Sequence, residues 1–118
     1  MMTEHDLTGF HEVSTLDELW AGETQLIEVA GTKVILVHTD DGVVSAIQEQ
    51  CPHQKVSLAD AELDGNKLTC SMHLWEMNPV TGCGINPGHA ALALYPTQVI
   101  DGRIYVSVDG ITPTSARS

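Results

Sequence analysis

The most constraining feature of the sequence is a pair of short motifs, each with one cysteine and one histidine. The first is Cys51-Pro52-His53, the second is Cys70-Ser71-Met72-His73, and sixteen residues separate the two. Side chains of these types are metal ligands, and four of them complete a typical protein metal site. We therefore expect a fold that holds the two motifs side by side.

The order of the ligands indicates which metal they bind. A zinc finger usually groups two cysteines and then two histidines, whereas each motif here supplies one of each. Thiolates suit ferric iron bridged by sulfide, and imidazole replaces thiolate on one iron of some clusters. The order favours a two-iron cluster, with a zinc site as the alternative. Analysis of bound iron and acid-labile sulfide separates these two hypotheses.

The pattern C-x-H, sixteen residues, C-x-x-H resembles the [2Fe-2S] site of Rieske proteins. Further stretches extend the similarity: Cys51-Pro52-His53-Gln54, His73-Leu74-Trp75, Thr81-Gly82-Cys83-Gly84-Ile85-Asn86-Pro87, Tyr95-Pro96 and Ile104-Tyr105-Val106-Ser107. Over residues 10–111 the chain resembles the Rieske ferredoxins of toluene 4-monooxygenase-type enzymes. Those proteins are small electron carriers of soluble diiron monooxygenases.

The resemblance implies one [2Fe-2S] cluster and assigns its ligands. Cys51 and Cys70 would bind one iron, and His53 and His73 the other. Cys83 falls outside the ligand pattern, and we interpret it as a bystander. The remaining histidines have no partner at metal spacing and are interpreted as ordinary: His5, His11, His38 and His89.

The resemblance also places Gln54, Trp75 and Pro87 around the cluster. For Trp75 the sequence leaves two roles open, packing over the cluster and participation in electron transfer or docking. High-potential Rieske proteins of respiratory complexes donate two hydroxyl hydrogen bonds to the cluster from positions that are Trp75 and Met77 here. Without those donors the reduced state is less stabilised, so we expect a low reduction potential.

Hydrophobic runs separated by Asp-Gly pairs predict an all-β, antiparallel domain. Asp-Gly is a strong hairpin signal because glycine takes a positive φ at little steric cost. The pairs occupy positions 41–42, 64–65 and 101–102, and strands are expected at residues 10–13, 25–29, 33–38, 43–48 and 103–108. A brief helical turn is expected after Ser14, because Thr15 and Glu18 have the spacing of a capping box.

The length of 118 residues suits one domain. The resemblance implies the Rieske fold, an antiparallel β-sandwich base with an inserted cluster-binding subdomain. The base is expected to consist of residues 10–48 and 93–110, and the cluster-binding subdomain of residues 49–92, within a single domain 1–118.

The chain is strongly acidic, with five basic and sixteen acidic residues and a formal charge of −11. This charge argues against binding to nucleic acid or to an anionic membrane surface, and favours a protein partner with a basic patch. We expect Glu76 to contribute to such docking more than Asp109 does. Neither a membrane-spanning run nor a secretion signal is recognisable, and three cysteines provide no disulfide framework, so the expected location is the cytoplasm.

The resemblance implies an electron-transfer ferredoxin rather than an enzyme. It would pass single electrons from an NADH-dependent flavin reductase to a diiron hydroxylase that oxidises an aromatic or alkene hydrocarbon. Two alternatives are the ferredoxin of an aromatic-ring-hydroxylating dioxygenase and the small Rieske subunit of a nitrite reductase. Leu74 and the run from Thr81 to Pro87 favour the first hypothesis.

Overall fold

A computed structural model of the chain describes residues 9–50, 57–65, 67–70, 76–86, 92–108 and 111. These residues form eleven strands and one 3-10 helix, in the order β1 (His11–Thr15), β2 (Glu23–Val29), β3 (Thr32–His38), β4 (Val44–Gln48), η1 (Leu58–Asp60), β5 (Glu62–Asp64), β6 (Lys67–Thr69), β7 (Glu76–Met77), β8 (Gly84–Asn86), β9 (Leu94–Tyr95), β10 (Thr97–Ile100) and β11 (Arg103–Val106). No helix in this part of the chain has the length and apolarity that crossing a membrane requires.

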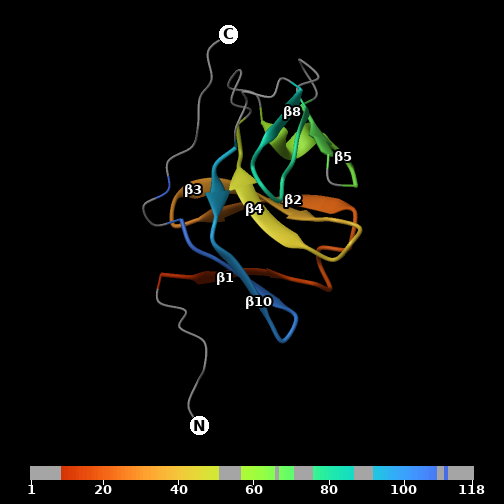
Figure 1. Ribbon diagram of the computed structural model, residues 1–118. Helices are drawn as coiled ribbons and strands as arrows, with labels where there is room; N and C mark the ends of the chain where they lie inside the picture. Colours follow the sequence, from red (N-terminus) through yellow and green to blue (C-terminus); the bar gives the residue numbers. More distant parts are fainter. Residues whose placement is uncertain are drawn as a thin grey trace.

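The strands form three antiparallel sheets, which confirms the predicted all-β class. Their strand orders are β1-β11-β10, β2-β3-β4-β9 and β5-β6-β7-β8. Figure 1 shows the sheet that contains β3 and β4 between the β1 and β10 strands on one side and the β5 and β8 strands on the other. The third sheet lies wholly within residues 62–86, between the two parts of the chain that form the other sheets.

Strand β3 explains why the sheets stack in this order. Its four central residues, Val34, Ile35, Leu36 and Val37, are all fully buried. Side chains alternate across a strand, so Val34 and Leu36 enter one core while Ile35 and Val37 enter the other. Burial of each side chain contributes roughly 1.5–3 kcal/mol, and β3 therefore anchors two layers at once.

Two hydrophobic cores result. The one between the first two sheets contains Leu19, Val29, Val34, Leu36, Ala46, Tyr95, Ile104 and Val106, and the one beneath the third sheet contains Ile35, Val37, Ile47, Leu58, Leu68, Cys70, Met77 and Leu92. Ile104 and Val106 are buried as their alternation in the sequence predicts.

The Asp-Gly hairpins are confirmed, since each pair joins two neighbouring strands. The glycines have positive φ, as at Gly42 (91°) and Gly65 (58°). At the third pair, Asp101 itself has φ 53° before Gly102 at 79°. Two successive positive φ values match the right-handed twist of the flanking strands.

The expected brief helical turn after Ser14 is present as a single turn that does not extend into a helix. Thr15 belongs to β1 and pairs with Arg103, and the Leu16 amide donates to the Gly102 carbonyl at 2.8 Å, so the chain is held by the first sheet. A single turn follows, closed by the Leu19 amide on the Thr15 carbonyl at 3.1 Å. Because Thr15 is also paired in the sheet, the capping signal leads to one turn only.

Tyr95 carries a buried hydroxyl for which the described part of the chain provides no partner. The side chain is 3% exposed, and its hydroxyl has no hydrogen-bond partner among the described residues. Burying a hydroxyl without a partner costs roughly 1–3 kcal/mol. We expect Tyr95→Phe to raise the free energy of unfolding by about 1 kcal/mol in urea titrations, because it removes the hydroxyl and keeps the ring.

The same tyrosine affects stability at high pH. Burial raises the pKa of the Tyr95 phenol above its usual value of 10.0, so the unfolded chain ionises first and stability is lost as pH rises above about 10. The loss should be smaller in Tyr95→Phe. Tyr105→Phe, at a half-buried position of β11, is the control, and a larger gain there than at Tyr95 contradicts the prediction.

Candidate metal centre

The first predicted motif lies in residues 51–56, here called the first ligand segment. Cys51, His53 and Gln54 are in this segment, which is outside the described residues. The residues on either side of it, Gln50 and Ser57, form an antiparallel bridge. The two ends of the segment are therefore held together.

The 3-10 helix η1 strengthens this closure. The Leu58 amide donates to the Glu49 carbonyl at 2.6 Å, and the Ser57 hydroxyl accepts from the Ala59 amide at 3.1 Å as the helix cap. Leu58 is fully buried in the second core. The chain that leaves the first ligand segment is thus fixed by a backbone bond, a cap and an apolar anchor.

The second ligand segment, residues 71–75, contains His73 and Trp75 and is also outside the described residues. Thr69 and Glu76 pair across it, at the ends of β6 and β7. The ion pair between Lys67 Nζ and Glu76 Oε2, at 3.5 Å, spans the same two strands. This segment, like the first, leaves and re-enters the sheet at neighbouring positions.

Cys70 is the predicted ligand that the structure describes. It follows β6 directly, is fully buried and forms no disulfide. Its core neighbours include Leu68, Met77 and Leu92. A thiol at the floor of the site, walled by apolar side chains, is a suitable ligand for a cluster whose sulfur ligands are thiolates.

Residues 87–91, the third segment, follow β8 and include Pro87 and His89, outside the described residues. Glu76 pairs with Asn86 of β8 as well as with Thr69 of β6. The second and third segments therefore meet at Glu76. Sequence reasoning did not identify this junction, because β7 has only two residues, Glu76 and Met77, too few to show a strand pattern.

Three buried residues, each close to an end of one of the three segments, lie in the same hydrophobic core. Leu58 follows the first segment closely, Cys70 precedes the second, and Leu92 follows the third. All three belong to one core cluster. Cysteine and histidine side chains from the first two segments would therefore meet over the second core, which fits the donor set of a two-iron cluster.

Gly82 supports the third segment through a close backbone contact. Its carbonyl accepts from the Leu92 amide at 2.8 Å, and its φ is 78°. A Cβ atom at this position would lie 2.7 Å from the Leu92 carbonyl oxygen. The backbone conformation and the close approach of Leu92 together require glycine at position 82.

The other sequence candidates are spread over the fold. Cys83 is exposed next to β8, and His11 is exposed on β1. His38 Nδ1 lies 2.9 Å from the Leu19 carbonyl oxygen, so this nitrogen carries a proton that it donates. His5 lies outside the described residues. Within the described ranges, no three His, Cys, Asp or Glu side chains gather as a metal site.

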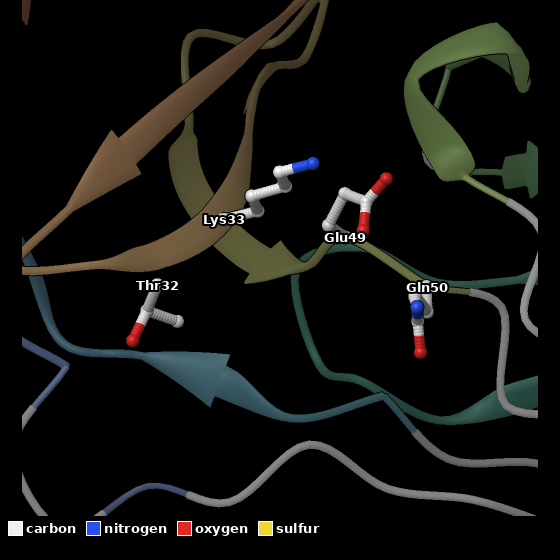
Figure 2. A pocket seen from close by; sticks show the side chains of 4 residues that line it. All are labelled: Thr32, Lys33, Glu49 and Gln50. Carbon is white, nitrogen blue, oxygen red and sulfur yellow. The ribbon is translucent and has the colours of Figure 1, made fainter.

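A hollow of about 150 Å³ lies beside the first ligand segment. Thr32, Lys33, Glu49 and Gln50 line it, and Figure 2 shows the Lys33 side chain reaching toward Glu49. Sites for drug-sized ligands usually occupy about 300–1,000 Å³. The hollow is too small and too open to enclose an organic substrate.

Sequence comparisons identify related proteins. The family described as Rieske [2Fe-2S] domain matches residues 9–96. The ferredoxin component of the alkene monooxygenase system of Xanthobacter autotrophicus is 34% identical over 107 residues, which cover 90% of this chain and 87% of that protein. The ferredoxin subunit of a 3-phenylpropionate/cinnamic acid dioxygenase from Photorhabdus laumondii is 31% identical, over 81% of this chain and 91% of that protein.

Solved structures share the fold. The ferredoxin of carbazole 1,9a-dioxygenase from Nocardioides aromaticivorans superposes with a TM-score of 0.76 at 26% identity, covering 83% of this chain and 96% of that one. A putative small subunit of an NADH-dependent nitrite reductase from Mycobacterium tuberculosis has a TM-score of 0.75 at 19% identity, covering 82% and 92%. The second likeness shows the fold alone.

Proposed function

Because this chain belongs to the Rieske [2Fe-2S] domain family, we propose that it serves as the ferredoxin component of a multicomponent monooxygenase. The chain is an electron carrier with one [2Fe-2S] cluster rather than a catalytic subunit. The observation that carries the proposal is the 34% identity, over 90% of this chain, to an alkene monooxygenase ferredoxin. When bound, the cluster supplies one-electron redox chemistry, and the protein contributes its surroundings and its docking surface.

The proposed ligands are Cys51 and Cys70 for one iron and His53 and His73 for the other. The support is the burial of Cys70 and the closure of each ligand segment by paired strand residues. We assign the cluster-binding subdomain to residues 49–92 and the base to residues 10–48 and 93–110. In support, the sheet β5-β6-β7-β8 lies within the first of these ranges.

The proposed partners are an NADH-dependent flavin reductase, which donates the electron, and a diiron hydroxylase, which accepts it. The hydroxylase would act on an alkene or aromatic hydrocarbon, and selectivity for that hydrocarbon belongs to the hydroxylase. The proposed location is the cytoplasm, since Cys83, which is no proposed ligand, is an exposed free thiol, and a reducing compartment keeps such a thiol reduced.

Reconstitution tests this function. The purified holoprotein should support NADH-dependent epoxidation of a short alkene when it is combined with the reductase and diiron hydroxylase of an alkene monooxygenase. A second candidate, the ferredoxin of a ring-hydroxylating dioxygenase, is favoured by the 31% identity to such a subunit. Turnover with a dioxygenase oxygenase component, and none with the diiron hydroxylase, would decide for that candidate.

Acidic residues next to the ligand segments should steer the docking of a basic partner. Glu49 precedes the first ligand segment, and Glu76 lies between the second and third. The Lys67 ion pair with Glu76 already offsets part of its charge, so Glu49 is the better acid to change first. The net charge of −11 should attract a basic partner, and the attraction weakens as the screening length falls from about 30 Å at 0.01 M to about 3 Å at 1 M salt.

We expect the second-order rate of electron transfer to the hydroxylase to fall as salt rises, measured by stopped-flow absorbance. Glu49→Gln should lower the low-salt rate about two- to fivefold, since rim charges act on association. Asp109 lies outside the described residues, so Asp40→Asn is the control. Asp40 is exposed at the opposite end of the β3–β4 hairpin. Equal losses in the two variants, or a rate indifferent to salt, would contradict charge-led docking.

A further inference from the structure

Gln48 is a buried amide at the end of β4, three residues before Cys51. Its side chain is 0% exposed, and the residue pairs across the sheet with Val34 of β3, which is equally buried. Burying an amide without hydrogen-bond partners destabilises a fold, because the amide loses its hydrogen bonds to water. Glutamine is therefore tolerated at this buried position only because its amide forms hydrogen bonds within the protein.

The two ends of the Gln48 amide reach two different parts of the chain. Nε2 donates to the Gln50 carbonyl at 2.6 Å, immediately before the first ligand segment. Oε1 accepts from the Ala93 amide at 2.8 Å, just after the third segment. The Gln48 backbone amide also donates to the Ala93 carbonyl at 3.2 Å. One side chain thus joins the entry of the first segment to the exit of the third.

This link complements the junction at Glu76. Strand pairing at Glu76 joins the second and third segments, but β4 and β9 pair only at Ala46 and Ile47. Beyond those pairs, the hydrogen bonds of Gln48 to Gln50 and Ala93 continue the connection toward the first segment. Supports of this kind orient metal ligands and adjust the properties of the metal, although they never touch it.

We propose that Gln48 is a positioning residue for the cluster, which fixes the first ligand segment relative to the third. The inference rests on the proposed assignment of Cys51 and His53 as ligands. Loss of the amide then loosens one side of the cluster, so both the retention of the cluster and its reduction potential change. Electron transfer depends on both properties.

The test compares Gln48→Met with Thr39→Val in the holoprotein. Methionine keeps the length of glutamine without its donor or acceptor. Thr39 is also 0% exposed, and its hydroxyl accepts from the Val43 amide at 3.2 Å at the far end of the same sheet. Both variants lose buried hydrogen bonds, but only Gln48 adjoins the ligand segments.

We expect both variants to lower the thermal midpoint, and Gln48→Met alone to alter the cluster. Its half-life in the presence of a chelator, followed by visible absorbance, should shorten about tenfold, the factor that corresponds to about 1.4 kcal/mol. Its midpoint potential and EPR g values should shift from those of the wild type, while Thr39→Val should retain both. Unchanged g values, potential and half-life in Gln48→Met would overturn the proposal.

A second variant covers the case in which Gln48→Met does not fold. Gln48→Asn is shorter by one methylene and cannot span Gln50 and Ala93 at once, so it should show the same shifts to a smaller degree. Asparagine with wild-type cluster properties would also overturn the proposal. Failure of the ligand assignment is separable, because pulsed EPR of the wild type would then show no coupling to two histidine nitrogens.

Discussion

Cys70→Ala abolishes the visible absorbance of the [2Fe-2S] cluster, whereas Cys83→Ser retains it: this is the expected result with the largest effect on function. Cys70 is fully buried in the second core, and Cys83 is exposed. Alanine at position 70 leaves one iron a ligand short in an apolar core whose members Leu58, Leu68 and Met77 offer no second thiolate. Serine at position 83 changes a surface thiol that no proposed ligand requires.

Purified proteins should be compared by visible spectrum and by iron and acid-labile sulfide content. Cys70→Ser is the matched variant, since it nearly preserves side-chain volume and separates loss of the ligand from loss of packing. It too should bind less than a tenth of the wild-type iron. The corresponding alanine variants of Cys51, His53 and His73 should behave as Cys70→Ala does. A normal spectrum in Cys70→Ala, or a lost one in Cys83→Ser, would contradict the assignment, and zinc without sulfide in the wild type would favour the alternative metal.

The sheet class was predictable because its signals are local. Asp-Gly pairs mark the hairpin turns, and alternation along residues 103–108 marks the buried face of β11. The order in which the three sheets stack was harder to predict from the sequence. The run Val34 to Val37 reads as a buried strand, but which face meets which core depends on partners far away in the chain.

The candidate site, too, was predictable from the sequence only in part. The ligand candidates could be identified from the sequence, because cysteine and histidine at this spacing seldom occur together except as metal ligands. Gln48 was not singled out, although a polar residue that ends an apolar strand is a signal that could have been noticed. The junction at Glu76 has no such signal, because it arises from pairing between β6, β7 and β8. The capping pattern at Thr15 and Glu18 leads to one turn only, because Thr15 is also paired with Arg103 of the distant strand β11.

Gly82 should be the most sensitive glycine of the described chain. Its φ of 78° is nearly that of Gly102, at 79°, so replacement by alanine imposes similar backbone strain at both positions. Their surroundings differ. A Cβ at Gly82 would lie 2.7 Å from the Leu92 carbonyl oxygen and 3.3 Å from Leu94 Cγ, whereas a Cβ at Gly102 has no atom within 4 Å.

The comparison of Gly82→Ala with Gly102→Ala therefore isolates the steric contact from the dihedral strain. Left-handed backbone costs a non-glycine residue roughly 1–2 kcal/mol, which should lower the melting temperature of Gly102→Ala by about 5 °C. Gly82→Ala must in addition displace the Leu92 backbone, and we expect a total above about 3 kcal/mol, or roughly 15 °C. Because Leu92 follows the third segment, the displacement should also speed loss of the cluster in Gly82→Ala alone. Melting curves followed by circular dichroism measure the loss of stability, and absorbance measures the loss of the cluster. Equal melting temperatures in the two variants would contradict the prediction, because they would show that the Leu92 backbone moves away from the added Cβ at no cost.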